Sequence, residues 1–185
     1  MLPVQIHLTM PPWIVELADE GRLYPADEDK IGLAIALAER NIEHNQGGPF
    51  GAAIFNQDGR LISVGVNRVV AQTCSVAHAE MMAYMSAQQR LASFRLNQDG
   101  GRYVLATSAQ PCCQCYGATV WAGVDELLIG ARAEDVEELT EFDEGPLPAD
   151  WVGELQRRGI AVRRDILRDQ ARSVLASYGE RGTSY

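Results

Sequence analysis

Two short strings in this sequence carry residue types that are suited to metal-assisted chemistry. They are His78-Ala79-Glu80 and Pro111-Cys112-Cys113-Gln114-Cys115. Each string comes directly before a run of good helix formers, so we expect each to open a helix. Residues three positions apart share one face of a helix, so Cys112 and Cys115 can bind one ion together, whereas Cys113 points elsewhere. Pro111 suits the first helical turn, where its missing N–H would be unpaired in any case.

One imidazole and two thiols make a donor set that suits zinc. A helix N-terminus carries partial positive charge, which lowers thiol pKa values and favours the thiolate. With His78, Cys112 and Cys115 as ligands, a fourth tetrahedral position stays open for water, which is the catalytic pattern. Zinc lowers the pKa of such a water to about 7. Glu80, two residues from a ligand, is placed to move a proton between that water and a substrate. The sequence therefore predicts one catalytic zinc ion per chain.

Each of these residues alone has a simpler explanation. His78 could end a helix without a ligand, and Cys112 and Cys115 could be a redox pair. They could also be half of a structural zinc site that Cys74 or Cys113 completes. Both strings together match the H-x-E and P-C-x-x-C arrangement of zinc nucleobase deaminases, which favours the catalytic interpretation. Cys74 and Cys113 are then expected to be small buried residues without a chemical role.

Hydrophobic periodicity predicts the elements that must position the two strings. A short helix is expected over 13–18, and an amphipathic helix from Asp27 ends at Gly47-Gly48-Pro49. Asp58-Gly59 joins two β-type runs, which is a strong hairpin signal. Further helices are expected over 79–91, 111–121 and 133–139. A polar loop over 141–151 should be followed by another helix, and a last helix should begin at about residue 168. Strands are expected over 103–108, 126–131 and 160–166. This order predicts an α/β fold with three layers, in which a mixed five-stranded sheet lies between helices. We expect one domain over 1–185, with 1–26 as an N-terminal extension packed on it.

The charge balance bears on the kind of ligand. Twenty-five acidic and sixteen basic residues give a formal net charge of −9, which repels a polyanion and favours a small molecule over nucleic acid. No apolar stretch approaches the roughly 20 residues of a membrane helix, and the N-terminus lacks the pattern of a signal peptide. Three of the four cysteines lie within four positions, too crowded for a disulfide framework. We therefore predict a cytoplasmic protein without nucleic-acid or membrane partners.

The residues of both strings resemble the cytidine deaminase superfamily, and the resemblance extends from about Asp27 onward. Several strings look more like the bacterial guanine deaminases, including those that accept triazines such as ammeline. They are GGPFGAAIF, NRVV…CSVAHAE, TSAQPCCQC and FDEGPLP. The resemblance implies the α/β/α fold, commonly a homodimer, and hydrolytic deamination of a free nucleobase, with guanine to xanthine and ammonia as the specific expectation.

The same resemblance implies roles in substrate binding. Asn67 would hydrogen-bond the ring carbonyl or a ring nitrogen, because an amide both donates and accepts. The backbone N–H of Ala79 would hold the same edge of the ring. Phe50 would lie against the ring face, with Phe142 and Trp121 as further walls. Simpler explanations are that Asn67 caps a turn and that Phe50 is an ordinary core aromatic.

The resemblance also implies a second acid in the site, and at one position this sequence departs from the pattern of the family. Glu144 would serve proton transfer beside Glu80, with Asp143 as the alternative bearer of that role; either could instead be an ordinary loop carboxylate. Many relatives have Glu directly before the Pro-Cys pair, whereas this chain has Gln110. Zinc binding should survive because Gln110 is not a ligand, but the surroundings of the ligands change.

Several functions remain open from the sequence. Ammeline or another triazine, cytosine, or a nucleoside are alternative substrates of the same chemistry. A tRNA adenosine deaminase would need a basic surface for a flipped base, which the charge argues against. A non-catalytic zinc or redox module would need a fourth protein ligand or no metal. Whether the C-terminal helix completes the site of a neighbouring copy is also open.

Overall fold

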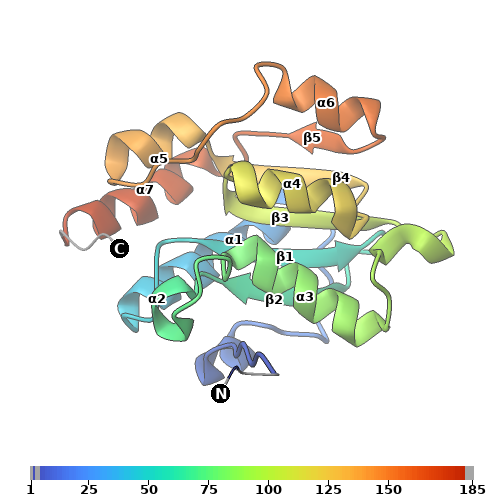
Figure 1. Cartoon of the computed structure of the whole chain (residues 1–185), viewed down its shortest axis with the longest axis horizontal. Helices are drawn as coiled ribbons and strands as arrows, with labels where there is room; N and C mark the ends of the chain where they lie inside the picture. The colour runs from blue at the N-terminus through green and yellow to red at the C-terminus, as the bar shows by residue number, and fades with distance from the viewer. Residues whose placement is uncertain (1, 3–4, 182–185) are drawn as a thin grey trace.

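In a computed structural model, which describes residues 2 and 5–181, a five-stranded sheet forms the middle of three layers (Figure 1). Its strands are β1 (Gly51–Asn56), β2 (Leu61–Val66), β3 (Tyr103–Ala109), β4 (Glu126–Ala131) and β5 (Ala161–Arg163). Their order is β2-β1-β3-β4-β5, with β1 antiparallel to both neighbours and β3, β4 and β5 mutually parallel. The sheet is therefore mixed, which confirms the predicted fold class.

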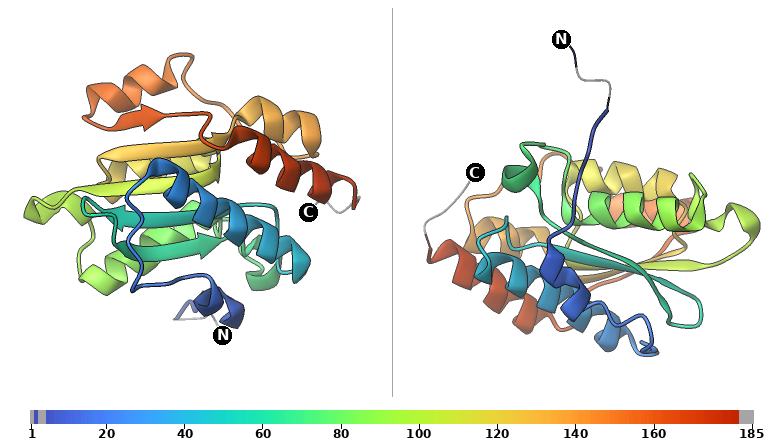
Figure 2. Two further views of the ribbon diagram at one scale, coloured as in Figure 1. Left: turned by 180° about the vertical axis from the view of Figure 1, so that it is seen from behind. Right: turned by 90° about the horizontal axis from the view of Figure 1, so that it is seen from below.

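Helices cover both faces of the sheet (Figures 1 and 2). The helical elements are η1 (Pro12–Glu16), α1 (Asp27–Glu43), α2 (Val69–Gln72), α3 (Ala79–Leu91), η2 (Leu96–Asp99), α4 (Cys113–Ala122), α5 (Ala133–Leu139), α6 (Trp151–Arg157) and α7 (Arg168–Gly179). Helices α3, α4 and α6 contribute to one apolar core, whereas α1, α5 and α7 contribute to the other. Successive residues of β1 alternate between these two cores, Ala53 and Phe55 facing α1 and α7, Ala52 and Ile54 facing α3 and α4. Burial on both faces explains the unbroken apolar run in β1.

Four predicted boundaries differ from the structure. The first helix is a 3-10 helix over Pro12–Glu16. The β-type run after Gly65 ends at Val66, and Val69 begins the short helix α2. Strand β5 is shorter than 160–166, since Asp165 adopts a left-handed backbone with φ 68° that an extended strand cannot contain. Pro111 lies before α4, because Cys112 has an extended backbone (φ −63°, ψ 174°) and is the N-cap.

The N-terminal segment packs against the body through its aromatic residue. Trp13 is buried with α1 in the same core, and its ring stacks on His44 with the ring centroids 5.4 Å apart. Residues 1, 3 and 4 of the expected extension, and residues 182–185 of the expected domain, lie outside the described part of the chain. Within the described part, no helix combines the length and apolar character needed to cross a bilayer.

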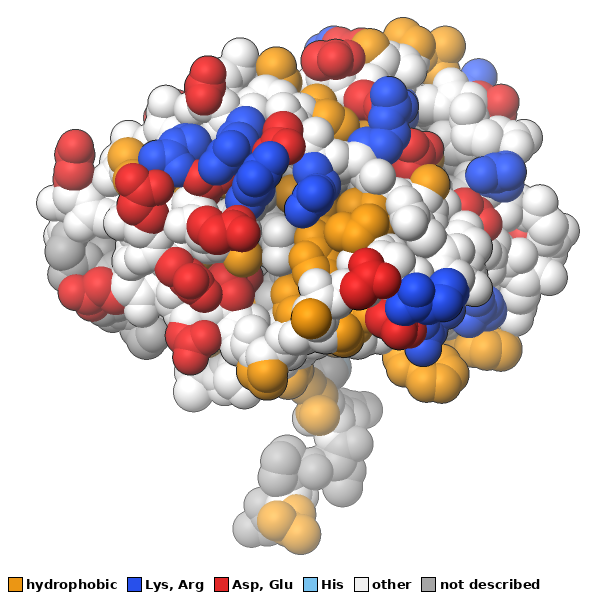
Figure 3. Space-filling view, turned by 90° about the horizontal axis from the view of Figure 1, so that it is seen from above, with side chains coloured by type: hydrophobic (Ala, Val, Ile, Leu, Met, Phe, Trp, Pro, Cys, Tyr) orange, Lys and Arg blue, Asp and Glu red, His pale blue; other side chains and the backbone are white. Residues whose placement is uncertain are grey.

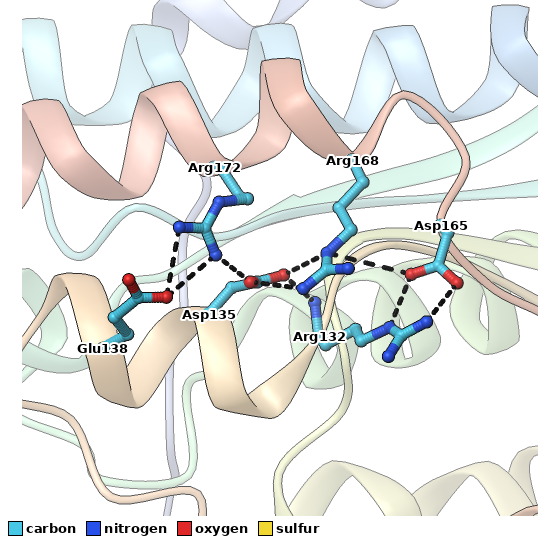
Figure 4. A network of polar contacts seen from close by, with 6 residues as sticks. All are labelled: Arg132, Asp135, Glu138, Asp165, Arg168 and Arg172. Atoms are coloured by element: carbon cyan, nitrogen blue, oxygen red, sulfur yellow. Dashed lines mark hydrogen bonds and ion pairs between the residues drawn. The ribbon is translucent and has the colours of Figure 1, made fainter.

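A network of ion pairs joins α5 to α7 (Figure 4). Its centre is Asp135, whose side chain is 1% exposed. The Asp135 carboxylate accepts two hydrogen bonds from Arg168 at 2.7 Å each, and it also accepts one from Arg172. These contacts, with Arg168 as the largest cause, hold the pKa of Asp135 well below its usual range. The network fixes α7 beside the loop that follows α5, and this loop carries Phe142 and Glu144.

Candidate active site

Three segments that are distant in sequence meet at one end of the sheet. Phe50 precedes β1, Asn67 follows β2 and Gln110 follows β3. Because β1 runs antiparallel to both β2 and β3, its first residue lies beside their last ones. The Asn67 N–H donates to the Phe50 carbonyl at 3.1 Å, which extends the ladder beyond the strands.

A cavity of about 380 Å³ opens at this end of the sheet. The residues that line it are Phe50, Asn67, His78, Glu80, Gln110, Cys112, Glu141, Phe142, Asp143 and Glu144. Its volume falls at the lower end of the range of roughly 300–1,000 Å³ that is typical of small-molecule sites. The cavity therefore suits a small ligand such as a single heterocycle.

The predicted zinc ligands come together at two helix N-termini. His78 is the N-cap of α3, Cys112 is the N-cap of α4, and Cys115 lies in the first turn of α4. The distance from His78 Nδ1 is 3.4 Å to Cys112 Sγ and 3.6 Å to Cys115 Sγ. One ligand atom from each residue lies within 4.8 Å of the others, which is close enough for all three to bind one ion.

A glycine in β2 permits this approach. A Cβ at Gly65 would lie 2.0 Å from the Ala79 carbonyl oxygen, far inside van der Waals contact. The first turn of α3 can therefore lie directly on β2, with Ala79 fully buried. This close contact sets His78 and Glu80 at the end of the sheet, opposite the start of α4.

The ionisation of the ligand cluster suits a cation. Hydrogen bonds from Cys115 and His78 lower the pKa of Cys112 to about 4, against the opposing effect of burial. The pKa of His78 is raised chiefly by its contact with Cys112, and the pKa of Cys115 is raised because its hydrogen bond and burial favour the thiol. None of the described residues that line the cavity is Lys or Arg. Two thiols and an imidazole beside buried acids fit Zn²⁺, which completes such a donor set.

Two buried carboxyl groups share the cavity with the ligands. Glu80 is 6% exposed, and burial together with the nearby Cys112 raises its pKa to about 7. Glu144 is 7% exposed, and the same two causes raise its pKa to about 8. Both groups are thus able to exchange protons near neutral pH.

The loop that carries Glu144 is tied to the start of α4. The Cys113 N–H donates to the Glu144 carbonyl at 2.9 Å. Gly145 has φ 68°, and a Cβ there would lie 2.6 Å from Cys113 Sγ, so only glycine fits without a shift. Asp143 lines the cavity but is exposed, and its carboxylate accepts the Gly145 N–H at 2.7 Å. The loop therefore buries Glu144 and leaves Asp143 at the rim.

Asn67 is held in one orientation by backbone groups. Its Oδ1 accepts hydrogen bonds from the Gly48 N–H at 3.3 Å and the Val69 N–H at 3.2 Å. Asn41 Nδ2 donates to the Asn67 carbonyl at 3.0 Å and to the Gly48 carbonyl at 2.9 Å. Asn67 therefore stabilises a turn and lines the cavity at once, with its Oδ1 directed to the backbone.

The aromatic residues divide into two groups. Phe50 and Phe142 both line the cavity, with their ring centroids 5.3 Å apart. Trp121 is 76% exposed and does not line it, because its position near the end of α4 faces outward. Sequence reasoning missed Tyr178 of α7, which stacks on Phe142 at 5.7 Å, because no local pattern reports a contact between segments so far apart. It also missed Glu141, although Glu141 directly precedes the FDEGPLP string.

The two remaining cysteines differ from expectation. Cys113 is exposed and Cys74 is partly buried, so the prediction that both are buried is wrong. Cys113 faces outward because the first turn of α4 directs Cys115 inward and its neighbour away. Among the described residues, the group able to hold a metal comprises His78, Cys112 and Cys115, without Cys74 or Cys113.

The fold and the site together define a zinc-dependent deaminase. The family model described as the cytidine and deoxycytidylate deaminase zinc-binding region matches residues 25–131. The chain belongs to this deaminase family. A solved structure of guanine deaminase from Nitrosomonas europaea superposes with a TM-score of 0.91 and 42% identity, covering 97% of this chain and 99% of that one.

Two curated relatives are deaminases of different substrates. Guanine deaminase of Bacillus subtilis is 35% identical over 111 residues, which are 60% of this chain and 68% of that protein. A tRNA-specific adenosine deaminase of Buchnera aphidicola is 26% identical over 154 residues, which are 83% of this chain and 95% of that protein.

Proposed function

We propose that this protein hydrolyses guanine to xanthine and ammonia. The observation that carries this proposal is a second buried acid, Glu144, in the same small cavity as Glu80 and the zinc ligands. Removal of an amino group from a ring needs proton transfer both to the ring and to the leaving nitrogen, which two acids can share. The likeness to the Nitrosomonas guanine deaminase over 97% of this chain supports guanine as the base.

In this proposal, His78, Cys112 and Cys115 hold the zinc ion. When bound, zinc supplies a water of lowered pKa as the nucleophile. Glu80 accepts the proton that this water loses as its oxygen adds to C2 of guanine, and passes that proton to the adjacent ring nitrogen. Glu144 carries the remaining hydroxyl proton to the amino group, so the C–N bond breaks and ammonia leaves. Burial and the nearby Cys112 raise the pKa of Glu144 in the metal-free protein, and its place beside Glu80 in the cavity allows it to act as the second proton carrier.

The same cavity offers groups for binding the ring. We propose that Phe50 and Phe142 contact its faces, since both line the cavity. The Nδ2 group of Asn67 would donate to a ring acceptor, because its Oδ1 already accepts from two backbone N–H groups. The backbone of Ala79 lies at the start of α3 beside the zinc ligand His78, and Asp143 forms the rim.

Turnover of zinc-loaded protein tests the proposal. Guanine should yield xanthine and ammonia in equal amounts, while ammeline, cytosine, adenine, their nucleosides and tRNA should react far more slowly. Figure 3 shows Lys and Arg side chains mixed with Asp and Glu on the face drawn, without the continuous basic surface that a polyanion needs. Guanine left unchanged at high enzyme concentration would refute the substrate.

A matched pair of variants tests the mechanism. Glu80→Gln removes the proton carrier but no zinc ligand, so we expect a loss of at least about a hundredfold in kcat with zinc content retained. Glu138→Gln makes the same change at an exposed position of α5 and should leave turnover intact. Full activity in Glu80→Gln would exclude Glu80 from the reaction.

We also propose that the chain is a single domain that acts as a homodimer in the cytoplasm. Adjacent helices α3 and α4 expose the apolar side chains of Met85 and Trp121, which a second copy could cover. Four cysteines that form no disulfide suit a reducing compartment. Light scattering tests the dimer: Trp121→Glu should yield monomers, whereas Val15→Glu, a change at an equally exposed residue of η1, should not.

A further inference from the structure

Gln110 differs from the other polar residues of the cavity. It is 7% exposed and lines the cavity, and its backbone N–H donates to the Ala131 carbonyl at 2.9 Å. Within the described part of the chain, its side-chain amide has no hydrogen-bond partner. The amide is not among the described side-chain groups that are sealed from solvent without a partner, so it opens to the cavity, where it can bind a group that the protein itself does not supply.

Two other polar groups of the cavity already accept hydrogen bonds from the backbone. The Asn67 Oδ1 accepts two backbone N–H groups, and the Asp143 carboxylate accepts the Gly145 N–H. Gln110 is also rigidly placed, since β3 ends at the preceding residue and the N-cap Cys112 follows two positions later. A preorganised amide with both its donor and its acceptor available is the kind of group that fixes the orientation of a ligand.

The chemistry of a carboxamide indicates what it would bind. A carboxamide donates from nitrogen and accepts at oxygen, so it pairs in two hydrogen bonds with a ring that carries a carbonyl beside an N–H. Guanine has this lactam edge at its C6 carbonyl and N1–H. A carboxylate at position 110 would only accept, and it would also add charge beside the buried Glu80 and Glu144.

We propose that Gln110 is a specificity-determining residue whose amide binds the lactam edge of the heterocycle. This inference rests on the proposed function, because it names the part of the proposed substrate that Gln110 binds. It predicts that Gln110 discriminates between guanine and a purine that lacks the C6 carbonyl.

Binding of two ligands to zinc-loaded variants tests this inference. Measurements use the Glu80→Gln background, which prevents turnover. Fluorescent 2-aminopurine has the amino group of guanine but neither the carbonyl nor the N1–H, and guanine displaces it. Gln110→Met has a similar length but no donor or acceptor. It should weaken guanine binding by about tenfold or more and 2-aminopurine binding by less than about threefold.

The outcomes separate direct contact from structural support. Gln89→Met, at an exposed position of α3, should change neither affinity. Equal losses for both ligands, loss of zinc, or unchanged guanine affinity in Gln110→Met would each overturn the assignment, as would failure of the parent to bind either ligand. If the protein with Glu80 intact does not deaminate guanine, the proposed function fails. The role of Gln110 is still decided by whether Gln110→Met weakens the binding of guanine more than that of 2-aminopurine.

Discussion

Replacing Asp135 with Asn removes the buried charge that joins α5 to α7 (Figure 4). The carboxylate accepts the Arg132 N–H at 2.8 Å as well as side-chain hydrogen bonds from Arg168 and Arg172. An amide keeps one acceptor and turns an NH₂ group toward a guanidinium. Breaking a buried ion pair costs about 3–5 kcal/mol. Because the two arginine side chains are 33% and 28% exposed and regain water, we expect about 2–4 kcal/mol.

Thermal unfolding of zinc-loaded protein at pH 7 measures this loss. For a chain of this length, about 2–4 kcal/mol lowers the Tm by roughly 4–16 °C. The depressed pKa of Asp135 means that its stabilisation is present above the unfolded pKa of about 3.9 and is lost as the pH falls below it, so the difference should shrink at low pH. The KM for guanine should also rise, since α7 carries Tyr178 against Phe142.

Glu138→Gln is the matched control for this prediction. Glu138 bonds the same Arg172 at 3.1 Å from an exposed position, and exposed ion pairs contribute little. If Asp135→Asn lowers the Tm no more than Glu138→Gln does, the buried carboxylate does not hold the two helices together and the reasoning is wrong.

Asn41→Asp keeps the side-chain volume but removes the amide donor to the Asn67 carbonyl, so kcat/KM for guanine should fall about tenfold with zinc content unchanged in metal analysis. Gly145→Ala places a Cβ against Cys113 Sγ in a left-handed backbone, so displacement of Glu144 should lower kcat more than it raises KM in steady-state kinetics. Adding Cys113→Ala should restore part of that loss, and a full-activity Gly145→Ala would contradict the close fit. In chelator-treated protein, the pKa of Glu144 is raised from 4.5 to about 8, so its contribution to stability is fully present below the lower value and is lost as the pH rises from there through about 8. Glu144→Gln should therefore gain stability relative to the parent as the pH rises from about 5 to about 8, and a constant difference in Tm across that range would refute the shift.

Local patterns determined much of this protein. The alternation and periodicity of apolar residues predicted the strands and most of the helices, because burial on a strand or helix face repeats with the local geometry. The spacing of Cys112 and Cys115 placed two thiols in one helical turn for the same reason. The sequence alone also singled out Gln110 as unusual, although not that its amide reaches the cavity.

Only the tertiary structure decided which distant residues meet. His78 approaches Cys112 because β2 and β3 end at the same edge of the sheet and because Gly65 lets α3 lie on β2. The sequence assigned the second acid to Glu144 and left Asp143 as the alternative. The hydrogen bond from the Cys113 N–H to the loop accompanies burial of the first and exposure of the second.

The contacts of the aromatic residues were likewise decided by the tertiary structure. A strand or helix pattern reports which side of an element is apolar, but not which other element covers it. Trp121 was therefore expected in the cavity and faces outward, whereas Tyr178 packs behind Phe142. Such contacts depend on how the layers pack, since α7, which the Asp135 network ties to α5, also packs on α1 and β4.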